Sequence, residues 1–333
     1  MTKMSAWECL GSALAGEELF SLAVSAPAAA GANGSGGPWI LAGSHQGLHG
    51  SDDAGQEWRL MSGALGDFPV MATAFSPDYP NSPGIFAGGA PGAVLRSFDD
   101  GESWEACGLD YPDVVVTGLV TTPSAYAEGV ILAGTADDGI YRSTTRGRYW
   151  ETANFGLYDL RVWSLSISPA WQADQTAFAV VGDGLFHSTI GARAWQTVAI
   201  DELGETLPQV VAISPDFGEN GAVYLGTAGE GIWYSRDRGK MWQPARGSEG
   251  TSVNCLAFSA GGARERTVYA GTTEHGILFS GDRGRSWLRL NEAELAAVWC
   301  LAETNCGAGK VLLAGVQGQG LVRFLQRLPD AEV

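Results

Sequence analysis

Charged and imidazole side chains occupy the tips of seven glycine-rich corners that recur along the chain. Five carboxylates and two histidines lie at these tips: His45, Asp137, Asp138, Asp183, Glu230, Glu274 and His275. Carboxylate oxygens and imidazole nitrogens could hold a divalent cation or orient the hydroxyl groups of a ligand. The alternative is that Asp and Gly are simply favourable residues for hairpin corners. Because clustered carboxylates repel one another, such a ring favours either an open solvated face or a positively charged or hydrogen-bonding partner.

Two tryptophans and an arginine lie beside these corners in the sequence. Trp163 and Trp299 begin apolar strands at positions equivalent to Phe20 and Met71, and Arg161 lies in the connection just before Trp163. An aromatic ring beside carboxylates can stack on a sugar or on an aromatic group. We therefore add Arg161, Trp163 and Trp299 to the candidate ligand-binding residues. The alternative is that both tryptophans pack between neighbouring repeats.

The element that must position these residues is a repeat of about 46 residues. Six tryptophans, at positions 58, 104, 150, 195, 242 and 287, are spaced 46, 46, 45, 47 and 45 residues apart, and each closes a short turn. Two apolar strands and a glycine-rich corner precede each turn, with a third strand between corner and turn and a fourth strand after it. Short runs of β-branched and aromatic residues between Gly, Pro and Asp clusters indicate β-strands. Since one such repeat cannot bury its own apolar face, neighbouring repeats must stack.

The count of repeats predicts a closed ring. The second strand of the repeat occurs seven times, whereas the tryptophan turn occurs six times, and the segment 5–9 is similar to the fourth strand at 103–107. This N-terminal segment can pair as the outer strand of the last sheet, which removes exposed edges. We predict an all-β fold, a single seven-bladed β-propeller of four-stranded antiparallel blades over residues 4–325. The N-terminal strand closes the last blade, and a C-terminal tail follows at 326–333.

The tryptophan turns resemble the Asp-box (BNR) repeat, whose pattern is Ser-x-Asp-x-Gly-x-Thr-Trp. Four turns keep the Ser, Asp, Gly and Trp of the pattern: 51–58, 97–104, 235–242 and 280–287. The other two depart from it. Thr145 replaces the Asp in 143–150, and Ile190 and Ala192 replace the Asp and Gly in 188–195.

This resemblance implies a propeller whose turns lie on the face away from the functional loops and have a local structural role. The family includes sialidases, xyloglucanases and photosystem II assembly factors. Sialidase chemistry would need an arginine triad, yet only Arg161 and Arg246 fall in the connections on the functional side. Xyloglucanase-like enzymes set two carboxylates across a cleft between two propellers, and this chain supplies one propeller. The single-propeller assembly factors act as protein-binding scaffolds.

Composition narrows the range of partners. The 333 residues carry 20 Lys and Arg against 37 Asp and Glu, which gives a formal net charge of −17 and a pI near 4.5. This balance argues against nucleic acid or an anionic membrane as partner, and it permits basic proteins, cations or neutral sugars. With no leader-like or membrane-spanning apolar run in the sequence, we expect a cytoplasmic protein. The five cysteines, together with His49 and His187 on third strands, are expected to be structural.

These observations favour a non-catalytic cytoplasmic binding or scaffold protein, most simply a monomer. It would engage a protein or small molecule where the corners surround the axis. The alternative is a hydrolase or lyase, glycan-directed or metal-assisted, that uses carboxylates on the same face. No nucleophile elbow, phosphate-cradling glycine motif or Cys/His metal spacing marks a catalytic set. The sequence therefore assigns no catalytic residue and no cofactor beyond the divalent cation that the corners could hold.

Overall fold

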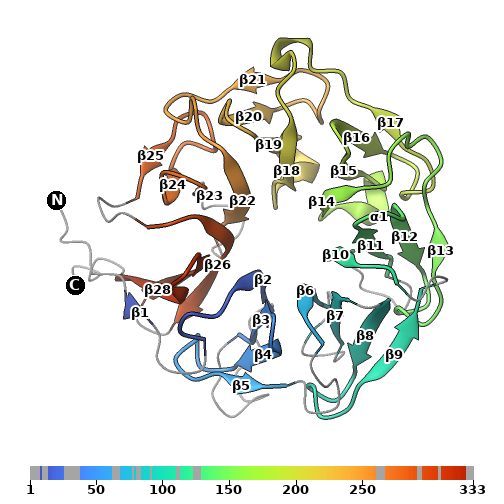
Figure 1. Ribbon diagram of the computed structural model, residues 1–333. Helices are drawn as coiled ribbons and strands as arrows, with labels where there is room; N and C mark the ends of the chain where they lie inside the picture. The colour runs from blue at the N-terminus through green and yellow to red at the C-terminus, as the bar shows by residue number, and fades with distance from the viewer. Residues whose placement is uncertain are drawn as a thin grey trace.

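Seven four-stranded antiparallel sheets form a ring in the computed structural model (Figure 1). The structure describes residues 8–9, 14–25, 38–61, 68–76, 79, 84–90, 92–109, 113–122, 129–259, 267–290, 295–306 and 309–327. Each sheet is one blade, with its first strand nearest the axis and its fourth strand at the rim. The predicted seven-bladed β-propeller is confirmed.

Strand bounds follow, from the inner to the outer strand of each blade. Blades 1 to 4 are β2 (Leu19–Val24), β3 (Ile40–Ser44), β4 (Gly47–Ser51), β5 (Arg59–Leu60); β6 (Val70–Phe75), β7 (Ile85–Gly89), β8 (Ala93–Ser97), β9 (Glu105–Gly108); β10 (Val116–Thr121), β11 (Ile131–Thr135), β12 (Ile140–Ser143), β13 (Glu151–Thr152); β14 (Val162–Ile167), β15 (Ala177–Val181), β16 (Gly184–Ser188), β17 (Gln196–Thr197). Blades 5 to 7 are β18 (Pro208–Ile213), β19 (Val223–Thr227), β20 (Ile232–Ser235), β21 (Gln243–Pro244); β22 (Val253–Phe258), β23 (Val268–Thr272), β24 (Ile277–Ser280), β25 (Leu288–Arg289); β26 (Val298–Cys306), β27 (Gly309–Val316), β28 (Gly320–Arg327), β1 (Glu8–Cys9).

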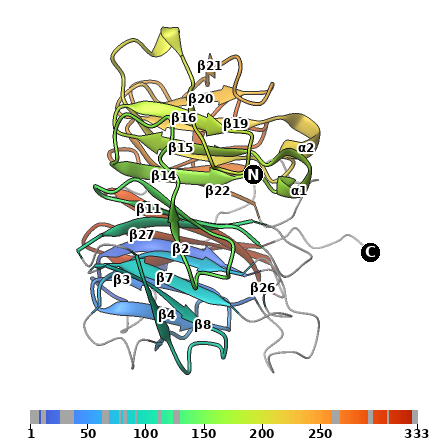
Figure 2. The same ribbon diagram turned by 90° about the vertical axis from the view of Figure 1, so that its right-hand side faces the viewer.

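Antiparallel pairing assigns the connections to two sides of the ring. The links between first and second strands share one side with the tryptophan turns, and two of these links contain the single-turn helices α1 (Trp171–Asp174) and α2 (Phe217–Asn220). Seen edge-on, α1 and α2 lie on the same side (Figure 2). The corners between second and third strands and the links from blade to blade, one of which contains the 3-10 turn η1 (Asp201–Leu203), share the other side. We call this second side the corner face.

None of the described helices has the length and apolar character that crossing a bilayer requires.

Local hydrogen bonds fix the tryptophan turns. In the turn 280–287, the Ser280 hydroxyl donates to Asp282 Oδ1 at 2.8 Å and accepts the N–H of Gly284 at 2.7 Å. Asp282 Oδ1 also accepts the N–H of Ser286 at 2.9 Å. Two successive residues, Arg283 and Gly284, have positive φ angles of 64° and 81°, a conformation that favours glycine.

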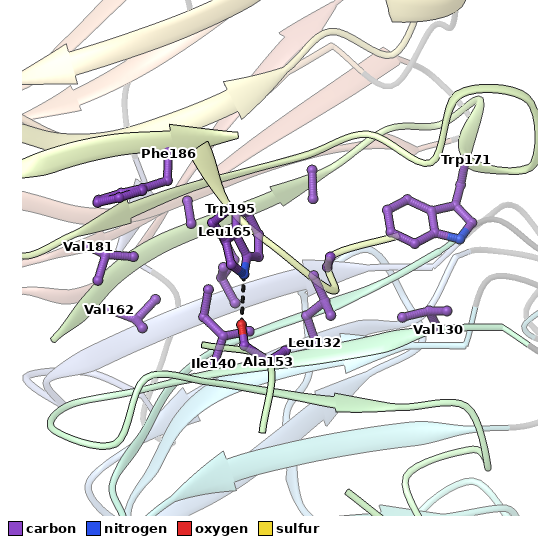
Figure 3. Close-up of a cluster of buried hydrophobic side chains, with 13 residues drawn as sticks. Val130, Leu132, Ile140, Ala153, Val162, Leu165, Trp171, Val181, Phe186 and Trp195 are labelled. Atoms are coloured by element: carbon purple, nitrogen blue, oxygen red, sulfur yellow. Dashed lines mark hydrogen bonds between the residues drawn. The ribbon is translucent and has the colours of Figure 1, made fainter. Parts of the chain in front are cut away.

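The divergent turn 188–195 keeps the two successive positive φ angles, although its glycine stands one position earlier than in the turn 280–287. Gly191 stands at the fourth position and Ala192 at the fifth, with φ angles of 75° and 58°. Ser188 Oγ still accepts the N–H of Ala192, at 3.1 Å. The Trp195 indole N–H donates to the Ala153 carbonyl of blade 3 at 2.8 Å, and so joins two blades (Figure 3). The turn therefore folds without its carboxylate.

Buried apolar side chains fill the interfaces between blades. The cluster in Figure 3 combines Leu132 and Ile140 of blade 3 with Val162, Phe186 and Trp195 of blade 4. Equivalent clusters occur at the other interfaces, including that between blades 7 and 1. The core of the propeller is thus a ring of interfaces rather than a central mass.

The N-terminal strand closes the ring as predicted. β1 pairs with β28, with Glu8 opposite Arg323 and Cys9 opposite Val322. Leu14 is 1 % exposed and packs in the cluster between blades 7 and 1. β28 continues to Arg327, two residues into the segment that the sequence assigned to the tail.

Candidate functional site

A β-bulge interrupts the innermost strand of every blade at its second residue. Pairing with the second strand skips one residue in each case, and these residues are Phe20, Met71, Thr117, Trp163, Gln209, Asn254 and Trp299. A bulge leaves one residue outside the ladder and redirects its side chain. The seven bulge residues therefore surround the axis where the first strands begin, at the corner face.

The polar and aromatic bulge residues behave differently. The Thr117 hydroxyl donates to the Val162 carbonyl of the next blade at 2.8 Å, and the Asn254 amide donates to the Val298 carbonyl at 3.2 Å. By contrast, the side chain of Trp163 is 59 % exposed and that of Trp299 is 40 % exposed. Neither indole is buried between blades, so both present apolar surface to solvent at the mouth of the ring.

Trp163 is held in place by the corner of its own blade. Its indole N–H donates to the Gly182 carbonyl at 3.0 Å. Gly182 has a φ of 55°, and a Cβ there would lie 2.6 Å from the Asp159 carboxyl carbon, so the corner requires glycine. Tyr158, whose ring lies 5.0 Å from that of Phe186, is 69 % exposed. Two exposed aromatic rings thus flank one corner.

Arg161 lies between the corners of blades 3 and 4 and is bound to Asp159. Its guanidinium donates to both Asp159 oxygens, with an Nη2 to Oδ2 distance of 2.6 Å, and its backbone N–H donates to Oδ1 at 2.8 Å. These bonds lower the pKa of Asp159 to about 2. The pKa of Arg161 is raised by the bond to Asp159 and, more weakly, by the nearby Asp183 and Asp137.

We call this surface the blade 4 patch: Asp137, Tyr158, Asp159, Arg161, Trp163 and Asp183. Three carboxylates and one guanidinium give it a formal charge of −2. The Asp137 and Asp183 side chains are exposed, and neither forms an ion pair within the described residues. The patch combines aromatic faces with unneutralised negative charge.

The remaining candidates do not join this patch. His45 pairs with Glu18 at 3.3 Å and its ring meets that of Phe20 edge-on, with centroids 4.7 Å apart, on blade 1. Trp299 lies on blade 7, and Glu274 and His275 are exposed at the corner of blade 6. The structure therefore gathers four of the ten sequence candidates, Asp137, Arg161, Trp163 and Asp183, at one place.

Asp138, Glu230 and His275 occupy equivalent positions in a hydrogen-bonded corner. In blade 3, the Thr135 hydroxyl donates to the Gly139 carbonyl at 2.7 Å and accepts the N–H of Asp138 at 3.0 Å. Thr227 and Thr272 make the same pair of bonds in blades 5 and 6. In the described residues, no three His, Cys, Asp or Glu side chains come together closely enough to hold a metal ion.

Sequence reasoning left two residues of the patch out of the candidate list, although both stand in the link beside Arg161. Tyr158 and Asp159 belong to the patch because their link runs between the corners of blades 3 and 4. The backbone N–H of Gly139 donates to the Leu160 carbonyl, and that of Gly182 donates to the Arg161 carbonyl. The apolar residues Phe155 and Leu160 of the same link are 80 % and 40 % exposed. The sequence signal that could have identified this link is its aromatic and aliphatic residues, Phe155, Tyr158 and Leu160, in an otherwise polar connection.

No known family model matches this chain, and no curated protein does. Solved structures do resemble it. YCF48 bound to a D1 peptide is 18 % identical, covers 99 % of this chain and 98 % of its own, and gives a TM-score of 0.66. YCF48 from Cyanidioschyzon merolae is 15 % identical over 96 % of this chain and 99 % of its own, with a TM-score of 0.67. The GH74 xyloglucanase from Xanthomonas campestris is 19 % identical over 97 % of this chain, with a TM-score of 0.67, and this chain spans 56 % of its length. At these identities the likeness shows a shared propeller fold.

Proposed function

We propose that this protein is a non-catalytic scaffold whose blade 4 patch binds a positively charged, extended peptide segment of a partner protein. The observation that carries the proposal is Trp163, which is 59 % exposed, is fixed by its bond to Gly182 and lies in a patch with a formal charge of −2. A cationic side chain over an exposed indole gains cation–π attraction, and nearby carboxylates strengthen it.

Three further facts support a peptide partner. The exposed Tyr158 and Leu160 extend the apolar surface along the link beside Trp163. The net charge of −17 attracts a basic partner and raises its association rate. YCF48, which matches this chain over nearly its full length, was solved with a bound peptide. An extended chain lying across adjacent corners would contact several of these side chains at once.

We also infer that the tryptophan turns are Asp-box repeats. The inference is supported by the shared Ser to Asp hydrogen bond, which is 2.8 Å long in the turns of blades 1, 2, 5 and 6. The Ser and Asp side chains of these turns thus serve the turn itself.

The second candidate function is glycan hydrolysis at the same patch. Asp137 and Asp183 are exposed carboxylates without an ion pair among the described residues. Asp183 follows Gly182, whose carbonyl accepts the indole N–H of Trp163, and this exposed indole could stack on a sugar ring. The likeness to GH74 enzymes supports this candidate, although this chain spans only about half of their length. Release of reducing sugar from xyloglucan, lost in Asp183→Asn and in Asp137→Asn, would favour it over the scaffold.

The direct experiment compares two synthetic peptides, one of alternating Arg and Ala and one of alternating Glu and Ala. We expect only the arginine peptide to bind in a fluorescence anisotropy titration, and Trp163→Ala to weaken binding about tenfold. Tyr149→Ala is the matched control, because Tyr149 is 66 % exposed but belongs to a tryptophan turn on the opposite side. Equal affinity of wild type and Trp163→Ala, with both folded, would refute the role of the patch.

A further inference from the structure

A second surface, independent of the blade 4 patch, lies between blades 4 and 5 on the side of the tryptophan turns. It is a groove of about 540 Å³, lined among others by His187, Thr189, Thr197, Arg238 and Lys240. This volume is in the range of pockets that take small molecules. The lining residues that the structure describes all fall within 129–259, a range that it describes without a gap.

The groove is positively charged although the chain as a whole is strongly acidic. Arg238 pairs with Asp174 at 3.6 Å, while Lys240 forms no ion pair with any residue that the structure describes. Among the described lining residues, one carboxylate, Asp174, against two cations leaves a formal charge of +1. His187 adds no charge at neutral pH, because burial lowers its pKa. The groove is thus suited to an anion.

Contacts on three sides fix the Arg238 guanidinium. It stacks over the Phe217 ring at 5.0 Å, donates to the Gly218 carbonyl at 3.2 Å and pairs with Asp174. The Asp174 carboxylate is itself held by the Ser168 hydroxyl and the Thr176 N–H, at 2.8 and 3.0 Å. A fixed guanidinium loses little side-chain entropy when an anion binds.

The tryptophan turn of blade 4, which contributes Thr189 to the groove, lacks the carboxylate of the pattern. In the neighbouring turn, Asp237 Oδ1 accepts the N–H groups of Lys240 and Met241 at 3.0 and 2.9 Å. The equivalent residue in blade 4 is Ile190, which follows Thr189 of the groove wall and is 51 % exposed. Ser188 Oγ and the two positive-φ residues maintain this turn without the carboxylate. Asp174, which is paired with Arg238, is therefore the carboxylate among the lining residues that the structure describes.

We propose that this groove is a binding site for a small molecule that carries a phosphate monoester. The Lys240 ammonium and the Arg238 guanidinium supply charge, and the Thr189 and Thr197 hydroxyls supply further donors to the phosphate oxygens. The apolar surface of Val198 and Ala199 contacts the uncharged part of the ligand.

The test is calorimetric titration of the full chain with O-phosphoserine, with serine as the unphosphorylated control. We expect phosphoserine alone to bind, and Lys240→Ala to weaken it about tenfold, as loss of a charge-assisted hydrogen bond predicts. Arg285→Ala is the matched control, since Arg285 has the position of Lys240 in the turn of blade 6 and does not line the groove. Ile190→Asp, which restores a carboxylate compatible with the turn, should also weaken binding while the protein stays folded.

Other outcomes overturn the proposal. Equal binding by wild type, Lys240→Ala and Arg285→Ala would show unspecific attraction of anions to the basic turns. If a phosphoserine peptide binds and free phosphoserine does not, the proposal of a small-molecule ligand is wrong, and the ligand is a phosphoprotein. Trp163→Ala should leave phosphoserine binding unchanged, so failure at the groove and failure at the blade 4 patch are separable.

Discussion

At the residue scale, the side chains of the tryptophan turns show how far sequence patterns specify local structure. Ser and Asp of the turn make the bonds that the pattern predicts. The substituted positions were less predictable: Thr145 accepts the Tyr149 N–H at 2.8 Å in place of Asp, and Ala192 adopts a φ of 58° where glycine was expected. The Thr145 hydroxyl preserves the turn 143–150, and the positive φ of Ala192 preserves the turn 188–195. The repeat pattern predicts neither substitution.

The first prediction at this scale concerns acid sensitivity. Burial opposes ionisation of Asp282, but hydrogen bonds from Ser286, Ser280 and the Arg285 N–H outweigh it and lower its pKa to about 2. A carboxyl whose folded pKa is depressed stabilises the fold above its unfolded pKa, near 4, and loses that contribution as the pH falls toward 2.

After allowance for solvent screening of a largely exposed group, the contribution is about 1 kcal/mol at neutral pH. We expect Asp282→Asn to lower the free energy of unfolding at pH 7 and to unfold with a shallower dependence on pH between 4 and 2. Urea titrations across that range provide the measurement. Parallel pH profiles for the two proteins would contradict the assignment.

The second prediction restores a lost carboxylate. Asp237 accepts two backbone N–H groups in its turn, whereas Thr145 accepts one. Thr145→Asp should therefore raise the free energy of unfolding by about 0.5 to 1 kcal/mol, measured by denaturant titration. A decrease would mean that the turn of blade 3 is adapted to the hydroxyl.

At the scale of elements, the sequence predicted the strands and corners but not how neighbouring blades are bonded to one another. Arg142 at the end of β12 is 6 % exposed, donates from Nε to the Gly191 carbonyl of the next blade at 2.9 Å and pairs with Glu151. Arg96 makes the equivalent bond to the Arg146 carbonyl. From the sequence alone, an arginine beside a turn is expected to be a solvated surface charge. The bonds of Arg142 and Arg96 to the next blade are seen only in the assembled interface between blades. The β-bulges that expose Trp163 and Trp299 could not be predicted either, because they depend on how the paired strands align.

The prediction at this scale is that Arg142 stabilises the interface between blades 3 and 4. Arg142→Ala should lower the free energy of unfolding by about 2 kcal/mol, because a buried carbonyl and Glu151 lose a charged donor. Arg148→Ala, at an exposed position of the next turn, should change it by less than about 0.5 kcal/mol. Similar values for the two variants would show that the bond between blades contributes nothing.

At the scale of the whole molecule, the repeat count and the displaced fourth strand were sufficient to predict the ring and its closure. Pairing of β1 with β28 confirms that argument. The sequence could not select a site, because seven-fold equivalence places similar corners everywhere. The blade 4 patch stands out only once exposure is known, with a tryptophan, a tyrosine and three carboxylates beside one arginine.

Ring closure yields a prediction through Leu14, which is buried between blades 7 and 1. Leu14→Ala should cost about 2 to 4 kcal/mol by leaving a cavity at the point where the chain ends meet. Denaturant unfolding measures this cost. A loss below about 1 kcal/mol would indicate that the segment before β2 does not secure the ring.

The central claim is that a cationic peptide binds at the corners of blades 3 and 4, and photo-crosslinking tests it most directly. An arginine peptide carrying benzoylphenylalanine would be crosslinked to the full chain, and the modified residues identified by mass spectrometry. The account predicts crosslinks within residues 136–139, 158–163 and 182–184, which excess unlabelled arginine peptide suppresses. Crosslinks confined to the tryptophan turns, or spread evenly over the corners of all seven blades, would contradict it.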